Sequence, residues 1–185
     1  MPGRNGDAYD DPYERRAAAG ENVHGEADFI TRLGARSVLD AGCGTGRIAR
    51  ELARRGLDVV GVDLDDIMLD TGRRKAPEIE WHTADLATVD LGRTFEAVLM
   101  AGNVMIYLTP GTEGAVLANM ARHLTPGGHL VAGFQLRRGG LTLERFDALG
   151  EAAGLALDRR YATWEDDPFV AGGGYAVSVH QKLKS

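Results

Sequence analysis

From residue 37 onward the sequence alternates short apolar runs with amphipathic stretches, and this alternation constrains the fold more than any other feature. Short apolar runs between turn signals are typical of buried strands, and apolar residues at helical spacing predict helices. Asp58–Val62 is one such strand; the helix after it must end before Pro77, and Ile79–Thr83 is the next strand. Because strand–helix alternation usually builds a parallel sheet covered by helices, we predict an α/β fold.

The last two strand-like stretches, Leu155–Trp164 and Gly174–Leu183, have no helix between them. Such a pair predicts an antiparallel addition at one edge of the sheet. The linker Glu165–Gly173 is acidic and then glycine-rich, and we predict that it forms a mobile hairpin loop.

A glycine-rich turn follows the first predicted strand, Ser37–Leu39. Gly42, Gly44 and Gly46 let the backbone approach a ligand closely, and ligands of open α/β sheets bind where loops leave the carboxyl ends of strands. Asp63 ends the next strand, 21 residues after Gly42, the spacing at which an acid reaches a ribose diol. These features predict a nucleotide-type site; the alternative is an ordinary turn with Asp63 as a helix cap.

Two residues favour one nucleotide over another. Arg47 stands where the dinucleotide fingerprint G-x-G-x-x-G has its third glycine. Asp40 precedes the glycines, and its carboxylate disfavours a pyrophosphate but suits a ligand with an ammonium and a sulfonium. The pattern therefore favours S-adenosylmethionine over NAD.

Four segments resemble motifs of the class I S-adenosylmethionine-dependent methyltransferases: VLDAGCGTG (38–46), VVGVDLDDIML (59–69), HTADL (82–86) and LTPGGHLVAGF (124–134). The resemblance runs from about Glu21 to the end of the chain. It implies a Rossmann-like open sheet of seven strands in the order 3-2-1-4-5-7-6, with strand 7 antiparallel and helices on both faces. We accordingly expect a methyltransferase domain at 21–185, preceded by a flexible or lid-forming segment at 1–20.

The same resemblance implies which residues bind the cofactor. Gly42 and Gly44 should line the methionine part, Asp63 should hold the ribose hydroxyls, and Asp85 should bond the adenine amino group. Ordinary core packing is the alternative for each apolar member of the set. The full predicted set is Asp40, Gly42, Cys43, Gly44, Asp63, Leu64, Met68, Asp85, Leu86, Ala101, Gly102 and Asn103.

Fewer residues bear on the methyl acceptor. The run AGNVMIY (101–107) replaces the Asp/Asn-Pro-Pro-Tyr/Phe signature of enzymes that methylate amino groups of bases or amides. His24 is our candidate general base, and a helix-start or surface histidine is the alternative. Tyr9 and Tyr13 are candidates for a lid, against a disordered tail. Arg137–Arg138 is a candidate grip for an anionic substrate, against an exposed basic turn.

Composition narrows the partners. A formal net charge of -6 argues against nucleic acid, and no apolar stretch approaches the roughly 20 residues of a membrane span. The single cysteine, Cys43, excludes an intramolecular disulfide and agrees with a reducing cytoplasm. His82, His123, His129 and His180 lack metal-ligand spacing, so no metal is predicted. We expect a cytoplasmic monomer or homodimer.

These observations predict S-adenosylmethionine-dependent methyl transfer to a small-molecule acceptor, with S-adenosylhomocysteine as the product. A small acceptor is favoured because the sequence has no large inserted cap. Two alternatives stay open: a non-catalytic S-adenosylmethionine-binding or regulatory protein on the same fold, and a nucleotide-dependent oxidoreductase.

Overall fold

A seven-stranded sheet in the order β3-β2-β1-β4-β5-β7-β6 forms the centre of the computed structural model, which describes residues 6–184. The strands are β1 (Ser37–Ala41), β2 (Asp58–Asp63), β3 (Glu80–Thr83), β4 (Phe95–Met100), β5 (Leu124–Gln135), β6 (Leu155–Tyr161) and β7 (Tyr175–Lys182). Neighbours from β3 to β5 pair in parallel, whereas β7 runs antiparallel to both β5 and β6. The predicted Rossmann-like order is confirmed.

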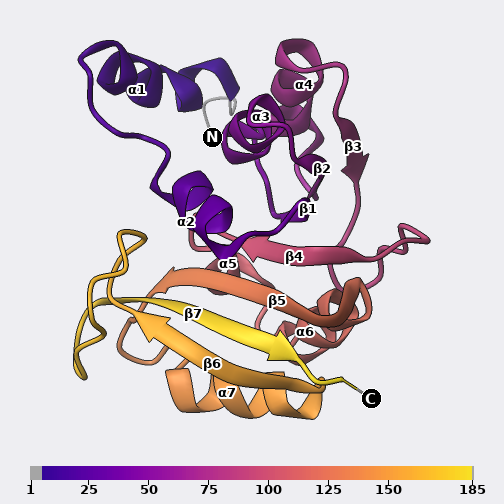
Figure 1. Ribbon diagram of the computed structural model, residues 1–185, viewed down its shortest axis with the longest axis vertical. Helices are drawn as coiled ribbons and strands as arrows, with labels where there is room; N and C mark the ends of the chain where they lie inside the picture. The colour runs from indigo at the N-terminus through magenta and orange to yellow at the C-terminus, as the bar shows by residue number, and fades with distance from the viewer. Residues whose placement is uncertain (1–5, 185) are drawn as a thin grey trace.

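Seven helices accompany these strands within the described residues. They are α1 (Gly6–Ala18), α2 (Gly25–Leu33), α3 (Arg47–Arg54), α4 (Asp66–Lys75), α5 (Val104–Tyr107), α6 (Glu113–Arg122) and α7 (Leu143–Ala152). Figure 1 shows α1, α3 and α4 at one end of the molecule and β6 with α7 at the other. None of the helices within residues 6–184 combines the length and apolar character needed to cross a membrane.

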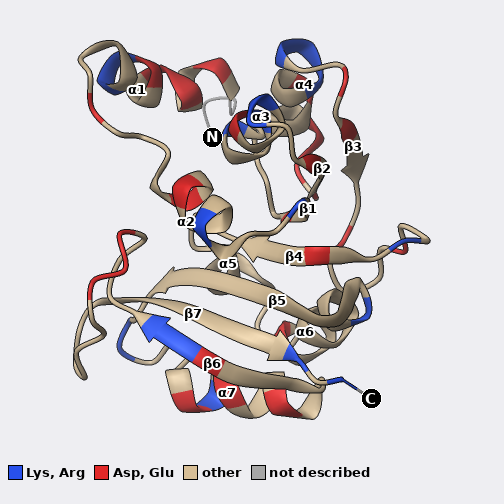
Figure 2. Cartoon of the chain, in the orientation of Figure 1, with Lys and Arg blue, Asp and Glu red and all other residues tan. Residues whose placement is uncertain are grey.

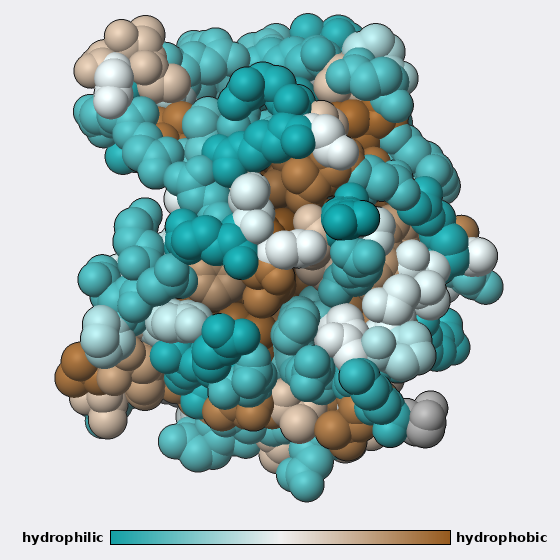
Figure 3. Space-filling model, viewed as in Figure 1, coloured by the Kyte–Doolittle hydropathy of each residue, from teal (hydrophilic) through white to brown (hydrophobic). Residues whose placement is uncertain are grey.

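Apolar side chains of the sheet divide between two core clusters, one on each face. Val38 packs in the cluster that contains Leu52 of α3, and its neighbour Leu39 packs in the cluster that contains Met120 of α6. Successive side chains of a strand point to opposite faces, so a strand with both faces covered has a continuous apolar run. In Figure 3, hydrophobic side chains appear between hydrophilic ones in the middle of the face shown.

Three segments refine or correct the sequence predictions. Gly6–Ala18 forms the helix α1, within the segment predicted to be flexible or lid-forming. The short helix α5 follows β4 and precedes α6, which begins at Glu113. Strand β6 ends at Tyr161, which leaves Trp164 in the loop before β7.

Candidate functional site

The glycine-rich turn after β1 adopts backbone conformations that favour glycine. Gly42, Gly44 and Gly46 have φ angles of 81°, 56° and 70°. The Gly42 amide donates to the carbonyl of Val62 at the end of β2, at 2.7 Å. A Cβ on Gly42 would lie 2.4 Å from Cγ2 of Val104, so no larger side chain fits there without movement. The turn is therefore a close approach of backbone to backbone at the carboxyl ends of two strands.

Asp63 joins the end of β2 to this turn. Its Oδ2 accepts a hydrogen bond from the Gly44 amide at 2.7 Å, and its Oδ1 accepts one from the Asp65 amide at 2.8 Å. Asp65 in turn caps α4 by accepting from the amides of Ile67 and Met68. Each oxygen of Asp63 retains acceptor capacity for a further donor, as a ribose hydroxyl requires.

Asp40 is the most unusual group at these strand ends. It is 2 % exposed, and its Oδ2 has no hydrogen-bond partner among the described residues. Burial raises the pKa of Asp40 to about 7, although the positive charge of Arg47 opposes the rise. An unpaired buried carboxylate oxygen is costly, and a complementary ligand group would remove that cost. The ammonium of S-adenosylmethionine has the charge and the donors that this oxygen lacks.

The loop after β4 brings three more predicted residues to the same edge of the sheet, because β4 lies beside β1. Ala101 is buried and Gly102 is exposed. Asn103 has a φ of 68°, donates its amide to the Gly133 carbonyl at 3.3 Å and accepts from the Gln135 amide at 2.8 Å. These bonds fix the loop against the end of β5.

The predicted adenine-side residues have different surroundings. Asp85 is exposed, and its Oδ1 accepts from the Ala87 amide at 2.8 Å. Leu86 is 7 % exposed and packs in the core cluster with α6. Leu64 is 71 % exposed, and Met68 is half-buried with its terminal methyl 3.8 Å from an ideal Cβ on Gly44. Leu64 and Met68 are thus free to cover a ligand, whereas Leu86 has a core role.

The surroundings of Cys43 do not favour a catalytic role. Burial raises the pKa of its thiol well above the usual range, and a Cβ on Gly61 would lie 3.1 Å from its Sγ. Trp81 fills the same region, and its Cη2 would lie 2.1 Å from a Cβ on Gly46. Trp81 therefore supports the glycine turn from beneath, a role that the sequence analysis did not identify.

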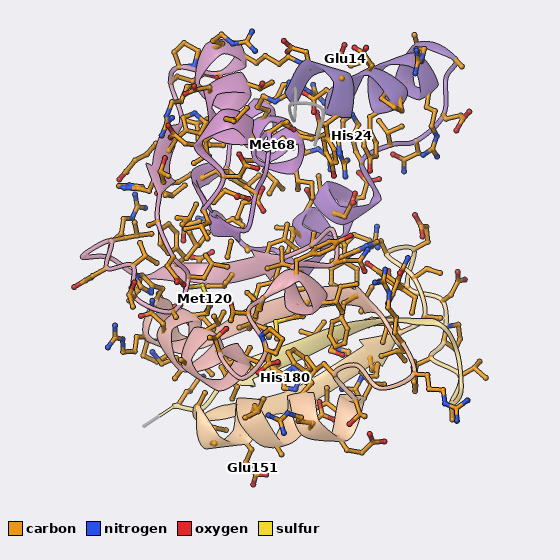
Figure 4. All side chains as sticks on the ribbon, turned by 180° about the vertical axis from the view of Figure 1, so that it is seen from behind. Glu14, His24, Met68, Met120, Glu151 and His180 are labelled. Atoms are coloured by element: carbon orange, nitrogen blue, oxygen red, sulfur yellow. The ribbon has the colours of Figure 1, made fainter. Side chains whose placement is uncertain are left out.

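His24 is not among the residues at the carboxyl ends of the strands. It borders a cavity of about 280 Å³ between α1 and α3, whose lining also includes Tyr13, Arg50 and Glu51. Its Nδ1 is buried and has no hydrogen-bond partner among the described residues. Figure 4 shows His24 near α1 and α2. A general base at this position stays a prediction, and the neighbours of His24 favour a structural role.

Arg47 contacts several elements. In the sequence it was notable only because it replaces the third glycine of the dinucleotide fingerprint. Its guanidinium lies 4.3 Å from the centre of the Tyr13 ring, donates to the Val23 carbonyl at 2.5 Å and pairs with Glu26 at 2.8 Å. Arg47 therefore connects α1, the α1–α2 linker and α2 to the first residue of α3. The charge directly after the glycines was the only sequence signal for this junction.

The two arginines after β5 were the candidates for binding an anionic substrate. Arg137 and Arg138 are exposed after β5, and Arg137 bonds the side chain of Gln135. No group of three or more His, Cys, Asp or Glu side chains in residues 6–184 is placed to hold a metal ion. The polar groups described at the strand ends are carboxylates, backbone amides and a nearby arginine.

Comparison with known proteins agrees with this geometry. Residues 38–128 match a family described as "Methyltransferase domain". A TehB-like SAM-dependent methyltransferase from Corynebacterium glutamicum is 37% identical in sequence, with a TM-score of 0.86 over 96% of this chain and 97% of that one. A SAM-bound amino pentose methyltransferase from Micromonospora echinaspora is 26% identical, with a TM-score of 0.72 over 93% and 96%.

A curated relative from Streptomyces venezuelae, a dTDP-3-amino-3,4,6-trideoxy-alpha-D-glucopyranose N,N-dimethyltransferase, is 37% identical over 98 residues. That match covers 52% of this chain and 41% of the relative, so the chain matches less than half of that enzyme's length. The Corynebacterium structure, in contrast, is matched almost throughout. The fold of the present chain, its glycine turn and these similarities together show that it belongs to the class I S-adenosylmethionine-dependent methyltransferases.

Proposed function

We propose that this protein transfers the methyl group of S-adenosylmethionine to a small-molecule acceptor. The observation that carries the proposal is the unpartnered oxygen of buried Asp40 beside a glycine turn that Asp63 ties to β2. An ammonium on Asp40 and ribose hydroxyls on Asp63 would hold the methionine part and the ribose of the donor. The matched relatives support a small acceptor, since two of them are named for amino sugars or amino pentoses.

The cofactor, when bound, supplies a methyl group on a positively charged sulfur. The residues of the chain then bind and orient. Asp40 and the turn at Gly42 would hold the methionine part, and the loop at Asn103, held by the end of β5, would lie on the side of the methyl group. Holding donor and acceptor in line supplies much of the acceleration, and a base is required only when the acceptor must lose a proton first.

Calorimetric titration with S-adenosylmethionine, S-adenosylhomocysteine and NAD tests the donor. We expect binding of both sulfur compounds and no response to NAD. Tight NAD binding without a response to either sulfur compound would favour the oxidoreductase alternative. Release of S-adenosylhomocysteine in the presence of small nucleophiles then separates an enzyme from a non-catalytic binding protein.

We further propose a cytoplasmic protein, monomeric or homodimeric, without a nucleic-acid partner. The net charge of -6 supports the last point because phosphate backbones bind clustered Lys and Arg. In Figure 2, acidic and basic residues both occur along α1, α3 and α4. Size-exclusion chromatography with light scattering measures the oligomeric state directly.

A further inference from the structure

Three residues from distant parts of the sequence lie near the end of β5: Trp164 and Tyr175 meet over Gly133, and Glu26 follows Gly25, where a Cβ would lie 3.4 Å from Cβ of Trp164. Glu26 lies in the first turn of α2, Trp164 in the loop between β6 and β7, and Tyr175 begins β7. Tyr175 pairs with Gln135 at the end of β5, and the Gln135 amide bonds the side chain of Asn103. We call Glu26, Trp164 and Tyr175 the aromatic–acid cluster.

The two aromatic members are held in place by several contacts. Trp164 donates its indole N–H to the Tyr175 hydroxyl at 3.2 Å and makes an edge contact with Phe29 at 5.6 Å between ring centres. Both rings occupy the space above Gly133, where a Cβ would lie 2.3 Å from Cζ2 of Trp164 and 2.6 Å from the Tyr175 oxygen. Gly133 is the residue whose carbonyl accepts from the Asn103 amide. Gly133 therefore lies next to both aromatic rings and is bonded to Asn103 of the proposed methyl-donor loop.

Glu26 contributes a negative charge to this arrangement. One oxygen pairs with Arg47, and the other makes no hydrogen bond with the described residues; the side chain is 16% exposed. Burial raises the pKa of Tyr175 to about 12, and the charge of Glu26 adds to the rise. The same charge also raises the pKa of Asp40. The charge of Glu26 thus influences both Tyr175 of the cluster and Asp40 of the proposed cofactor site.

We propose that the aromatic–acid cluster binds the methyl acceptor and that this acceptor is a small amine. The inference rests on the proposed methyl transfer and specifies its substrate class. Aromatic faces together with a carboxylate attract an amine in its protonated form, and the carboxylate accepts an N–H hydrogen bond from the neutral form. An anionic acceptor is disfavoured by the unpaired carboxylate oxygen of Glu26.

The chemistry balances with no additional reactant. The lone pair of the neutral amine nitrogen forms a bond to the methyl carbon, and the carbon–sulfur bond breaks with its electron pair passing to sulfur. The products are neutral S-adenosylhomocysteine and a methylated ammonium, which then releases a proton to solvent. A neutral amine needs no base before attack, in agreement with the position of His24 away from the strand ends.

The test uses the protein loaded with S-adenosylhomocysteine and three probes of one shape: benzylamine, benzyl alcohol and benzoate. Calorimetric titration should show the amine binding at least tenfold more tightly than the alcohol, and benzoate binding most weakly. Equal or tighter binding of benzoate or of the alcohol overturns the inference, and so does an absence of binding by all three.

Variants locate the effect. Glu26→Gln should remove the preference for the amine, and Tyr175→Phe, which retains the ring, should weaken amine binding several-fold. Glu144→Gln changes an exposed acid in the first turn of α7 and should leave the preference intact. An unchanged preference in Glu26→Gln contradicts the inference.

Binding of S-adenosylhomocysteine is measured first for each protein. If the wild-type protein does not bind S-adenosylhomocysteine, the proposed function is contradicted. Retained cofactor binding without an amine preference contradicts only the aromatic–acid cluster as the acceptor site.

Discussion

The carboxyl group of Asp40 is buried, lacks one hydrogen-bond partner and has a pKa raised to about 7, chiefly by burial. Only the ionised form complements the ammonium of S-adenosylmethionine. Affinity for the cofactor should therefore be constant well above pH 7 and fall about tenfold per pH unit below it. Calorimetric titration between pH 5.5 and 8.5 measures this profile.

Asp40→Asn provides the control for that profile. The amide does not titrate, so cofactor binding by the variant should be weak and independent of pH in this range. A raised carboxyl pKa also means that the ionised group destabilises the ligand-free fold above pH 7. The variant should consequently unfold at a higher temperature than the wild-type protein at pH 8. An identical pH profile in both proteins would assign the titration to another group.

Gly42 gives a second prediction at the residue scale. Gly42→Ala adds a Cβ at a φ of 81° and 2.4 Å from Val104, whereas Gly111→Ala adds one at a φ of 91° with nothing within 4 Å. Both variants should lose about 1–2 kcal/mol of stability from the backbone conformation. Only Gly42→Ala should also weaken cofactor binding, by tenfold or more in calorimetry. Equal cofactor affinities would show that the approach to Val104 is unimportant.

At the scale of elements, α1 is held by polar contacts rather than by an apolar face. Its residue Asp10 is 1 % exposed, accepts from Thr45 and pairs with Arg50 at 2.5 Å and with Lys75 at 2.8 Å. These partners lie on the glycine turn, α3 and α4. The carboxylate of Asp10 thus fixes α1 beside the glycine turn.

Asp10→Asn should release α1 without unfolding the sheet. The substitution removes two ion pairs but leaves partners that are themselves partly exposed, so we expect a loss of about 1–3 kcal/mol confined to this helix. Hydrogen exchange of the α1 amides should accelerate, while exchange in β1 and β4 stays slow. Asp11→Asn, at the exposed neighbouring position, is the matched control. Equal exchange in the two variants would contradict the role of Asp10.

The contrast between α1 and the strands explains what sequence analysis predicts well. Strands such as β1 and β4 consist of apolar residues buried on both faces, so their local pattern reveals them. The only buried residues of α1 are Gly6 and Asp10, and the ion pairs of Asp10 join residues 40 and 65 positions apart. No local pattern reveals such partners, and only the fold brings them together.

The same limit applies to the site. Asp40, Gly42 and Asp63 are predictable because each follows directly from a strand end and its turn. The roles that we propose for Glu26 and Trp164 were not predicted, because they arise where α2 and the β6–β7 loop meet the end of β5. A residue whose role depends on the pairing of distant strands has no signature in its own neighbourhood.

At the scale of the whole molecule, a buried histidine lies on β7, beside the edge strand β6 and on the side of the sheet away from β3. His180 of β7 is 1 % exposed and bonds Asp147 of α7 through Nε2 at 3.0 Å, and Asp147 also pairs with Arg160 of β6 at 2.5 Å. Figure 4 shows His180 at the α7 end of the molecule. His180 thus lies where β7, α7 and β6 meet.

Burial lowers the pKa of His180, even though Asp147 favours the charged form. The unfolded chain therefore binds a proton more readily than the folded one, so stability is complete above the usual histidine pKa of about 6.5 and declines as the pH falls below it. His180→Gln should reduce the loss of unfolding free energy between pH 7 and pH 5, measured by urea denaturation. The pKa of the half-buried His129 is also lowered by burial, and His129→Gln should have a smaller effect in the same direction. An equal loss in wild-type protein and His180→Gln would contradict this account, because the pH dependence would then arise from groups elsewhere in the fold.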